Sequence, residues 1–112
     1  MAASSPVARS ATTRQPVRVD RAAFTDVTAH MLQDLGLAQH DAADVADILV
    51  WTDARGIGTH GTFCVPIHYA KPLRLGGIKP DAKPLLVKET GSTAIVDGDA
   101  GLGTSRPCLP PA

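Results

Sequence analysis

Two stretches in the first half of the chain space their apolar residues as amphipathic helices do. In the first stretch the apolar side chains recur mostly three or four residues apart, at Phe24, Val27, Met31, Leu32 and Leu35. Asp20 is suited to cap the start of this helix and Gly36 to end it. A second helix is predicted from about Asp41 to Ala54, ended by Gly56, with an inner stripe of Val45, Ile48, Leu49 and Thr52. Each helix needs a partner surface for its apolar side.

The second half of the chain changes from a helical to an extended pattern. A third helix is predicted over Phe63–Leu75, with Pro66 in its first turn and Pro72 placed to kink or end it. Two short β-prone runs, Leu85–Glu89 and Thr93–Asp97, then flank a glycine-containing loop and predict a hairpin. A lone hairpin is marginally stable, so we expect it to belong to a larger sheet. The predicted fold class is α/β, or α+β within this stretch.

Composition and charge narrow the class of protein. The 112 residues hold at most one domain. The 11 basic residues match the 11 acidic ones, so no dense basic face indicates a nucleic-acid partner. No apolar run approaches the roughly 20 residues that span a bilayer, so no membrane partner is expected. Cys64 and Cys108 fit neither a zinc spacing nor a disulfide framework, which favours a reduced, cytoplasmic setting and no metal site.

The two ends of the chain lack this periodicity. Residues 1–19 carry three arginines and no acidic residue, which leaves open a disordered tail and an organelle transit peptide. Residues 104–112 are rich in proline and predict an aberrant or disordered tail. The folded region is therefore expected at residues 20–103.

Residues 55–63, with the sequence RGIGTHGTF, contain a literal match to G-x-G-x-x-G. One interpretation is a dinucleotide-binding turn, which needs a strand before its first glycine and a helix after its last. The spacing before Gly56 is helical, which favours a second interpretation, a loop between two helices that presents His60. Histidine exchanges protons near neutral pH. Thr59 could orient the ring or bind a substrate oxygen, and Arg55 could hold a carboxylate. The alternative for this loop is structural, with Thr59 capping the next helix and His60 solvated.

The order of these segments resembles the malate/L-lactate dehydrogenase family, which includes ureidoglycolate and sulfolactate dehydrogenases. The matching pattern is R-G-x-x-[Ser/Thr]-H-G at residues 55–61, G-G-I-x-P at 76–80, a hairpin, and D-G-D-x-G-x-G at 97–103, and the likeness covers about Val19 to Gly103. The resemblance implies a non-Rossmann fold and a homodimer. It also implies hydride transfer between NAD or NADP and a small 2-hydroxy, 2-oxo or imino acid.

The resemblance also implies roles for individual residues. Thr59 and His60 match the Ser/Thr–His pair of the family's active site and are the expected catalytic residues. Arg55, Cys64 and His68 are the expected substrate-binding positions, although relatives carry an arginine and a tyrosine where this chain has Cys64 and His68. The spacing around Pro72 is also one residue longer than in the family pattern. The cofactor-binding residues stay unassigned.

Relatives continue beyond the D-G-D-x-G-x-G segment into the part that holds their cofactor site. We therefore expect a truncated fragment of the enzyme that is inactive alone. The alternative is a non-catalytic helical module that associates with a partner or with a full-length subunit.

Overall fold

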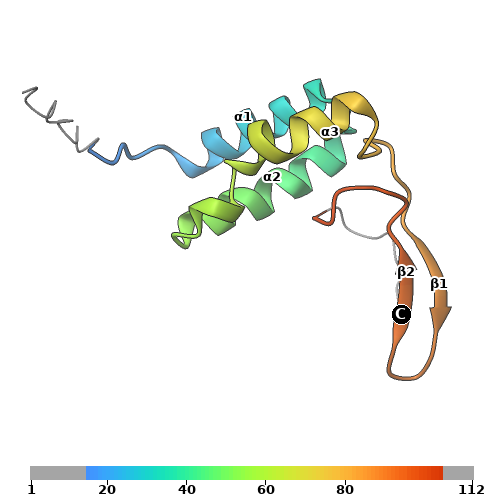
Figure 1. The fold of residues 1–112 in the computed structure, drawn as a ribbon. Coiled ribbons are helices and arrows are strands. Elements are labelled where there is room, and N and C mark those ends of the chain that lie inside the picture. The colour runs from blue at the N-terminus through green and yellow to red at the C-terminus, as the bar shows by residue number, and fades with distance from the viewer. Residues whose placement is uncertain (1–14, 105–112) are drawn as a thin grey trace, which may run out of the picture.

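The computed structural model describes residues 15–104. Three helical segments come first in the chain and a hairpin follows them, as predicted. In Figure 1 the helices lie together and the hairpin extends away from them. The elements are α1 (Arg21–Asp34), α2 (Gln39–Ala54), η1 (Gly58–His60), η2 (Val65–Tyr69), α3 (Ala70–Leu75), β1 (Leu85–Glu89) and β2 (Ala94–Asp97). The tail predictions for residues 1–14 and 105–112 fall outside the described residues. No helix within residues 15–104 is long and apolar enough to cross a membrane.

Helix α1 begins and ends at the predicted residues. The Asp20 carboxylate accepts a hydrogen bond from the Ala23 amide at 2.9 Å, and Gly36 takes a positive φ of 106° just after the helix. The predicted inner face is partly wrong, because Val27 is 57% exposed and Met31 is 42% exposed. The buried face is instead made of Thr28, Ala29 and Leu32. The large apolar residues that guided the prediction lie along one flank of α1. The face of α1 that is buried includes smaller side chains, Thr28 and Ala29.

Helix α2 lies against α1 along its length (Figure 1). Val45 and Leu49 are buried as predicted, but Ile48 is 39% exposed. The rest of the buried face consists of smaller residues, Ala42, Ala46 and Val50. Alanines in the contact let two helices approach closely, and a pattern of large apolar residues does not detect them. Gly56 ends the helix at a φ of 79°, where the Ile57 amide donates to the Thr52 carbonyl.

The third helical segment differs from the predicted single helix. It opens with a π-helical turn, η2, in which the Ala70 amide donates to the Val65 carbonyl, and it continues as α3 to Leu75. A π turn holds one more residue than an α turn. Pro72 neither ends nor begins the segment. In a regular α-helix its ring would meet the carbonyl of His68, and this carbonyl lies within the π turn.

The hairpin forms as predicted, with β1 antiparallel to β2. Leu85 pairs with Asp97 and Glu89 pairs with Ala94, and a bulge interrupts the register between Leu86 and Lys88. Within residues 15–104 the sheet has these two strands alone. Leu85 and Ile95 are 65% and 59% exposed, so the hairpin adds little to the core.

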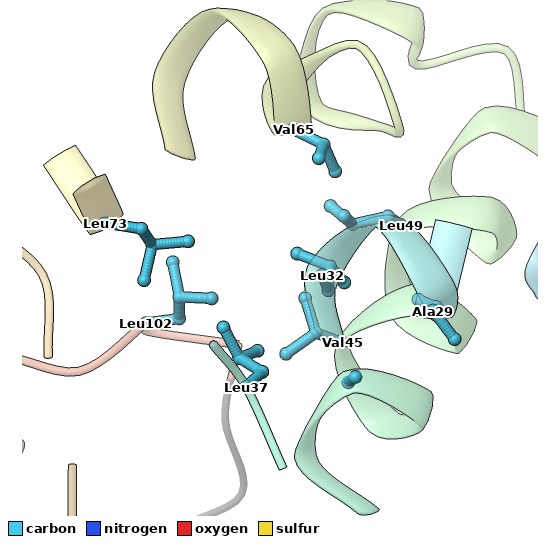
Figure 2. Packing of buried hydrophobic residues seen from close by; sticks show 10 residues of the cluster. Ala29, Leu32, Leu37, Val45, Leu49, Val65, Leu73 and Leu102 are labelled. Carbon is cyan, nitrogen blue, oxygen red and sulfur yellow. The ribbon is translucent and has the colours of Figure 1, made fainter. Parts of the chain in front are cut away.

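The core lies between α1, α2 and the third helical segment (Figure 2). Its largest fully buried side chains are Leu32, Leu49, Val45 and Val65. Leu102, which follows the hairpin, joins the same cluster and brings the chain back to the helices. Near this point the Asp99 carboxylate accepts hydrogen bonds from the Lys79 ammonium at 2.8 Å and the Lys83 amide at 3.1 Å. These contacts connect the base of the hairpin to the segment that follows α3.

Replacing Leu32 by alanine tests this core. Leu32 is fully buried, so Leu32→Ala should lower the free energy of unfolding by about 2–5 kcal/mol. Val27→Ala, on the exposed flank of the same helix, should change it by less than about 0.5 kcal/mol. Urea titration followed by circular dichroism measures both. Equal losses would contradict the assignment of the buried face.

The Asp99 contacts predict a pH dependence. The Lys79 hydrogen bond, and then that of the Lys83 amide, lower the pKa of Asp99 below its ordinary value. The ionised form is favoured in the folded chain, so this contribution to stability is present above the ordinary aspartate pKa and is lost as pH falls through the lowered one. The chemical shift of the Lys83 amide proton should therefore titrate with a midpoint below that of a peptide aspartate. Asp99→Asn should abolish this titration, and Asp81→Asn should preserve it. A midpoint at the ordinary value would refute the pairing.

Candidate functional site

The loop of residues 55–63 leaves the end of one helix and leads into another. Helix α2 runs to Ala54, so a helix and not a strand delivers the chain to Gly56. A dinucleotide-binding turn needs a strand at this position. The interpretation of G-x-G-x-x-G as such a turn is therefore wrong, and the interpretation as a loop between helices is confirmed.

Thr59 and His60 form the short helix η1 at the outer part of this loop. The Thr59 hydroxyl and the His60 Nδ1 atom are 2.9 Å apart, and the His60 amide donates to the Ile57 carbonyl. The Thr59 side chain thus contacts the ring rather than capping the next helix, whose N-cap residue is Cys64. Both residues are exposed. A partner on Nδ1 fixes one side of the imidazole and leaves Nε2 available for another molecule.

The Asp53 carboxylate joins the two ends of this loop. One oxygen, Oδ2, accepts hydrogen bonds from the Thr62 amide at 3.0 Å and from the Thr62 hydroxyl at 2.5 Å. Gly61 lies directly against the carboxylate, and a Cβ atom at this position would collide with it. The close approach of side chain and backbone therefore requires glycine here. The sequence pattern did not single out Asp53, and this contact was not predicted.

Arg55 stacks on an aromatic side chain. Its guanidinium carbon lies 3.9 Å from the centroid of the Trp51 ring, one helical turn earlier. Such a cation–π contact uses the flat face of the guanidinium. The N–H donors lie at its edges, so stacking leaves them able to form a bidentate pair with a carboxylate. Trp51 was not singled out from the sequence, although its spacing of four from Arg55 is the signal that pairs them.

Cys64 and His68, at the start of the third helical segment, differ in their exposure. Cys64 is a buried free thiol, and its Sγ atom is 3.6 Å from the Thr59 carbonyl oxygen to which it donates. It therefore supports η1 from inside. His68 is exposed, and its ring meets the edge of Phe63 with centroids 6.3 Å apart. The Cys64 thiol thus contacts the Thr59 carbonyl and the His68 ring contacts Phe63, so the two expected substrate-binding positions have different partners.

Tyr69 is a second residue that sequence reasoning missed. It follows His68 at the end of the π turn, is half-buried, and packs against the core cluster. Burial, and after it the charge of a nearby Cys64 thiolate, raise the pKa of Tyr69 above its ordinary value. The π turn holds one more residue than an α turn and lies just before Pro72, around which a longer spacing was expected from the sequence.

Two further features of residues 15–104 bear on ligand binding, namely metal-binding side chains and surface hollows. Among residues 15–104, no group of three or more His, Cys, Asp or Glu side chains is arranged to hold a metal ion. A surface hollow of about 310 Å³ lies between α1 and the third helical segment, lined by Met31, Asp34, Leu35, Val65, Pro66, Ala70 and Arg74. None of the predicted site residues lines this hollow, so it does not contribute to the candidate site.

Comparisons with known proteins point to one family. A family model described as malate/L-lactate dehydrogenase matches residues 19–106. The L-sulfolactate dehydrogenase of Methanocaldococcus jannaschii is 40% identical over 73 residues, which cover 65% of this chain and 21% of that protein. The malate dehydrogenase of Pyrococcus horikoshii is 34% identical over 87 residues, or 78% of this chain and 24% of that protein. Its solved structure superposes with a TM-score of 0.72 over 79% of this chain and 25% of that one. The chain thus spans about a quarter of the length of these relatives.

The electrostatic influence of Cys64 on the pKa of Tyr69 is open to direct measurement. Tyr69 is the only tyrosine in the sequence, so phenolate absorbance reports it alone. Cys64→Ala should lower the Tyr69 pKa but leave it above the ordinary tyrosine value, because burial is the larger cause of the shift. Val27→Ala, at an exposed position of α1, is the control and should leave the Tyr69 pKa unchanged. A return to the ordinary value in Cys64→Ala would show that the thiolate and not burial dominates.

Proposed function

The chain belongs to the malate/L-lactate dehydrogenase family, and we propose that it contributes the Thr59–His60 pair to the active site of an NAD- or NADP-dependent oxidoreductase. The proposed substrate is a small 2-hydroxy, 2-oxo or imino acid. The observation that carries the proposal is the 2.9 Å contact between the Thr59 hydroxyl and His60 Nδ1. It orients an exposed imidazole at the point where the family pattern has its Ser/Thr–His pair.

In the proposed reaction, His60 exchanges a proton at the substrate's reacting oxygen or nitrogen. With Nδ1 occupied by Thr59, the ring presents Nε2 to the substrate. A positioned general acid or base of this kind contributes about 10² to 10⁴ in rate. The nicotinamide, when bound, gives or takes the hydride. The segment of residues 56–61 does not fit that cofactor, because a helix precedes it, and the cofactor ligands stay unassigned.

The substrate carboxylate is proposed to bind at Arg55. The thiol of Cys64 cannot replace a guanidinium in a bidentate pair, and it is turned toward the Thr59 carbonyl. Arg55, in contrast, precedes η1 in the same loop and is held in place by Trp51. His68 and Tyr69 at the π turn are the further substrate-side candidates, His68 being the exposed one.

A second candidate function is association without catalysis. Large apolar side chains are exposed at the end of the loop, on the third helical segment and on the hairpin: Phe63, Ile67, Val87 and Ile95 are 54–60% exposed. Such side chains favour contact with another polypeptide surface. An interaction module would use them and would not depend on the chemistry of His60, which separates the two functions experimentally.

A chimera tests the catalytic proposal. Residues 19–103 would replace the matching segment of the Pyrococcus horikoshii malate dehydrogenase, and reduction of 2-oxo acids by NADH and NADPH would be followed. His60→Ala should lower kcat by about 10² to 10⁴, because the proton exchange is lost. His40→Ala, an exposed position on α2, should leave kcat unchanged.

Two outcomes would contradict the proposal. If His60→Ala behaved like His40→Ala in an active chimera, the catalytic role would be lost and association would be the better interpretation. The 112-residue chain without the remainder of the relative should show no turnover, because it spans about a quarter of the relatives' length. Turnover by that chain alone, lost on His60→Ala, would show that these 112 residues suffice for catalysis.

A further inference from the structure

We propose that Asp53 is a positioning residue for the Thr59–His60 pair, acting through Thr62. This inference rests on the proposed function of His60, and it concerns how the loop that carries His60 is held. The family pattern at residues 55–61 begins after Asp53 and assigns it no role. The inference comes from the hydrogen bonds of the Asp53 carboxylate.

The first support is the way the Asp53–Thr62 pair closes the loop. The two residues are nine positions apart, and Arg55, Thr59 and His60 all lie between them. Two donors of Thr62 reach the same carboxylate oxygen, so the closure is held by the backbone and the side chain of one residue. Charge-assisted hydrogen bonds of this kind are stronger than neutral ones. The carboxylate therefore fixes both ends of the segment that presents the ring.

The second support is the place of Asp53 on its helix. Asp53 stands in the last turn of α2, next to Ala54. A negative charge near the C-terminus of a helix is unfavourable, because the helix carries partial negative charge there. The hydrogen bonds from Thr62 offset this cost. Gly61 is buried beneath the same carboxylate, so the loop is shaped to receive it.

The third support is that the ring has a different partner. His60 Nδ1 contacts the Thr59 hydroxyl, and the Asp53 oxygen that forms hydrogen bonds is occupied by Thr62. Asp53 thus acts on the histidine only through the loop. On the inner side the Cys64 thiol donates to the Thr59 carbonyl. The backbone at Thr59 is therefore restrained by Cys64 on the inner side. The Asp53–Thr62 pair restrains the same loop three residues further along the chain.

The test measures the state of the imidazole in the 112-residue chain. With ¹⁵N-labelled histidine at about pH 9, where an imidazole is neutral, the Nδ1 and Nε2 shifts report the tautomer of His60. His60→Ala identifies its signals among the four histidines. The wild-type chain should show an excess of one tautomer. Asp53→Ala and Thr62→Val should each shift the ratio toward that of a free histidine peptide and increase the mobility of the amides of residues 57–61.

Matched variants separate positioning from general destabilisation. Thr62→Ser keeps the hydroxyl and should restore the wild-type ratio. Asp47→Asn changes an exposed carboxylate on the same helix and should have no effect on His60. Thr62→Val keeps the whole of Asp53, so the outcome does not depend on whether Asp53→Ala folds. An unchanged His60 tautomer and unchanged loop mobility in a folded Thr62→Val would overturn the proposal.

The chimera distinguishes this inference from the proposed function. If both hold, Asp53→Ala should lower kcat by up to about 10²-fold through misplacement of the ring, with KM little changed. If Asp53→Ala shifts the tautomer and neither it nor His60→Ala changes kcat, positioning holds and the catalytic role of His60 fails. If His60→Ala abolishes turnover and Asp53→Ala leaves both tautomer and kcat unchanged, the catalytic role holds and positioning fails.

Discussion

The described fold depends on one packing contact, the burial of Leu32 between α1, α2 and the third helical segment. Leu32, Leu49 and Val65 are each 1% exposed or less and come from these three segments. Alanines 42 and 46 let the first two helices approach. With that contact in place, both ends of the loop at residues 55–63 start from rigid elements. The loop can then hold a defined shape although its own side chains are mostly exposed.

The loop is shaped by polar contacts rather than by burial. Asp53, Thr62 and Gly61 close it, Thr59 contacts the ring of His60, and Cys64 supports it from within the protein. A short 3-10 helix at the tip keeps Thr59 and His60 adjacent. The glycines that resemble a nucleotide-binding motif thus serve turns and a close approach to a carboxylate. This arrangement suits a side chain that must face a partner surface while staying fixed.

The sequence predicted the elements well and the contacts between them less well. The Asp20 cap, the end of α2 at Gly56 and the hairpin all follow from short-range patterns, in which neighbours along the chain decide the structure. The inner faces of α1 and α2 were partly misassigned, because Val27 and Ile48 are as apolar as the residues that are buried. The Asp53–Thr62 pair joins residues nine apart through a loop, and no local pattern encodes such a contact. The π turn at Val65–Tyr69 was not predicted, because the spacing around Pro72 suggested an irregularity without indicating its position or its geometry.

The π turn at Val65–Tyr69 has a consequence for how this segment tolerates a change in length. An α-helix turns by about 100° per residue, so one inserted residue would rotate everything after it by that angle. Leu73 would then leave the core, and Pro72, the residue before it, would take its place. A π turn at Val65–Tyr69 accommodates one additional residue without rotating the helix that follows. Leu73 therefore stays buried, and Gly76 ends the helix in a left-handed conformation. The side of α3 that faces the core is therefore kept. The backbone changes only locally, at residues 68 and 69, beside the loop where substrate contacts are proposed.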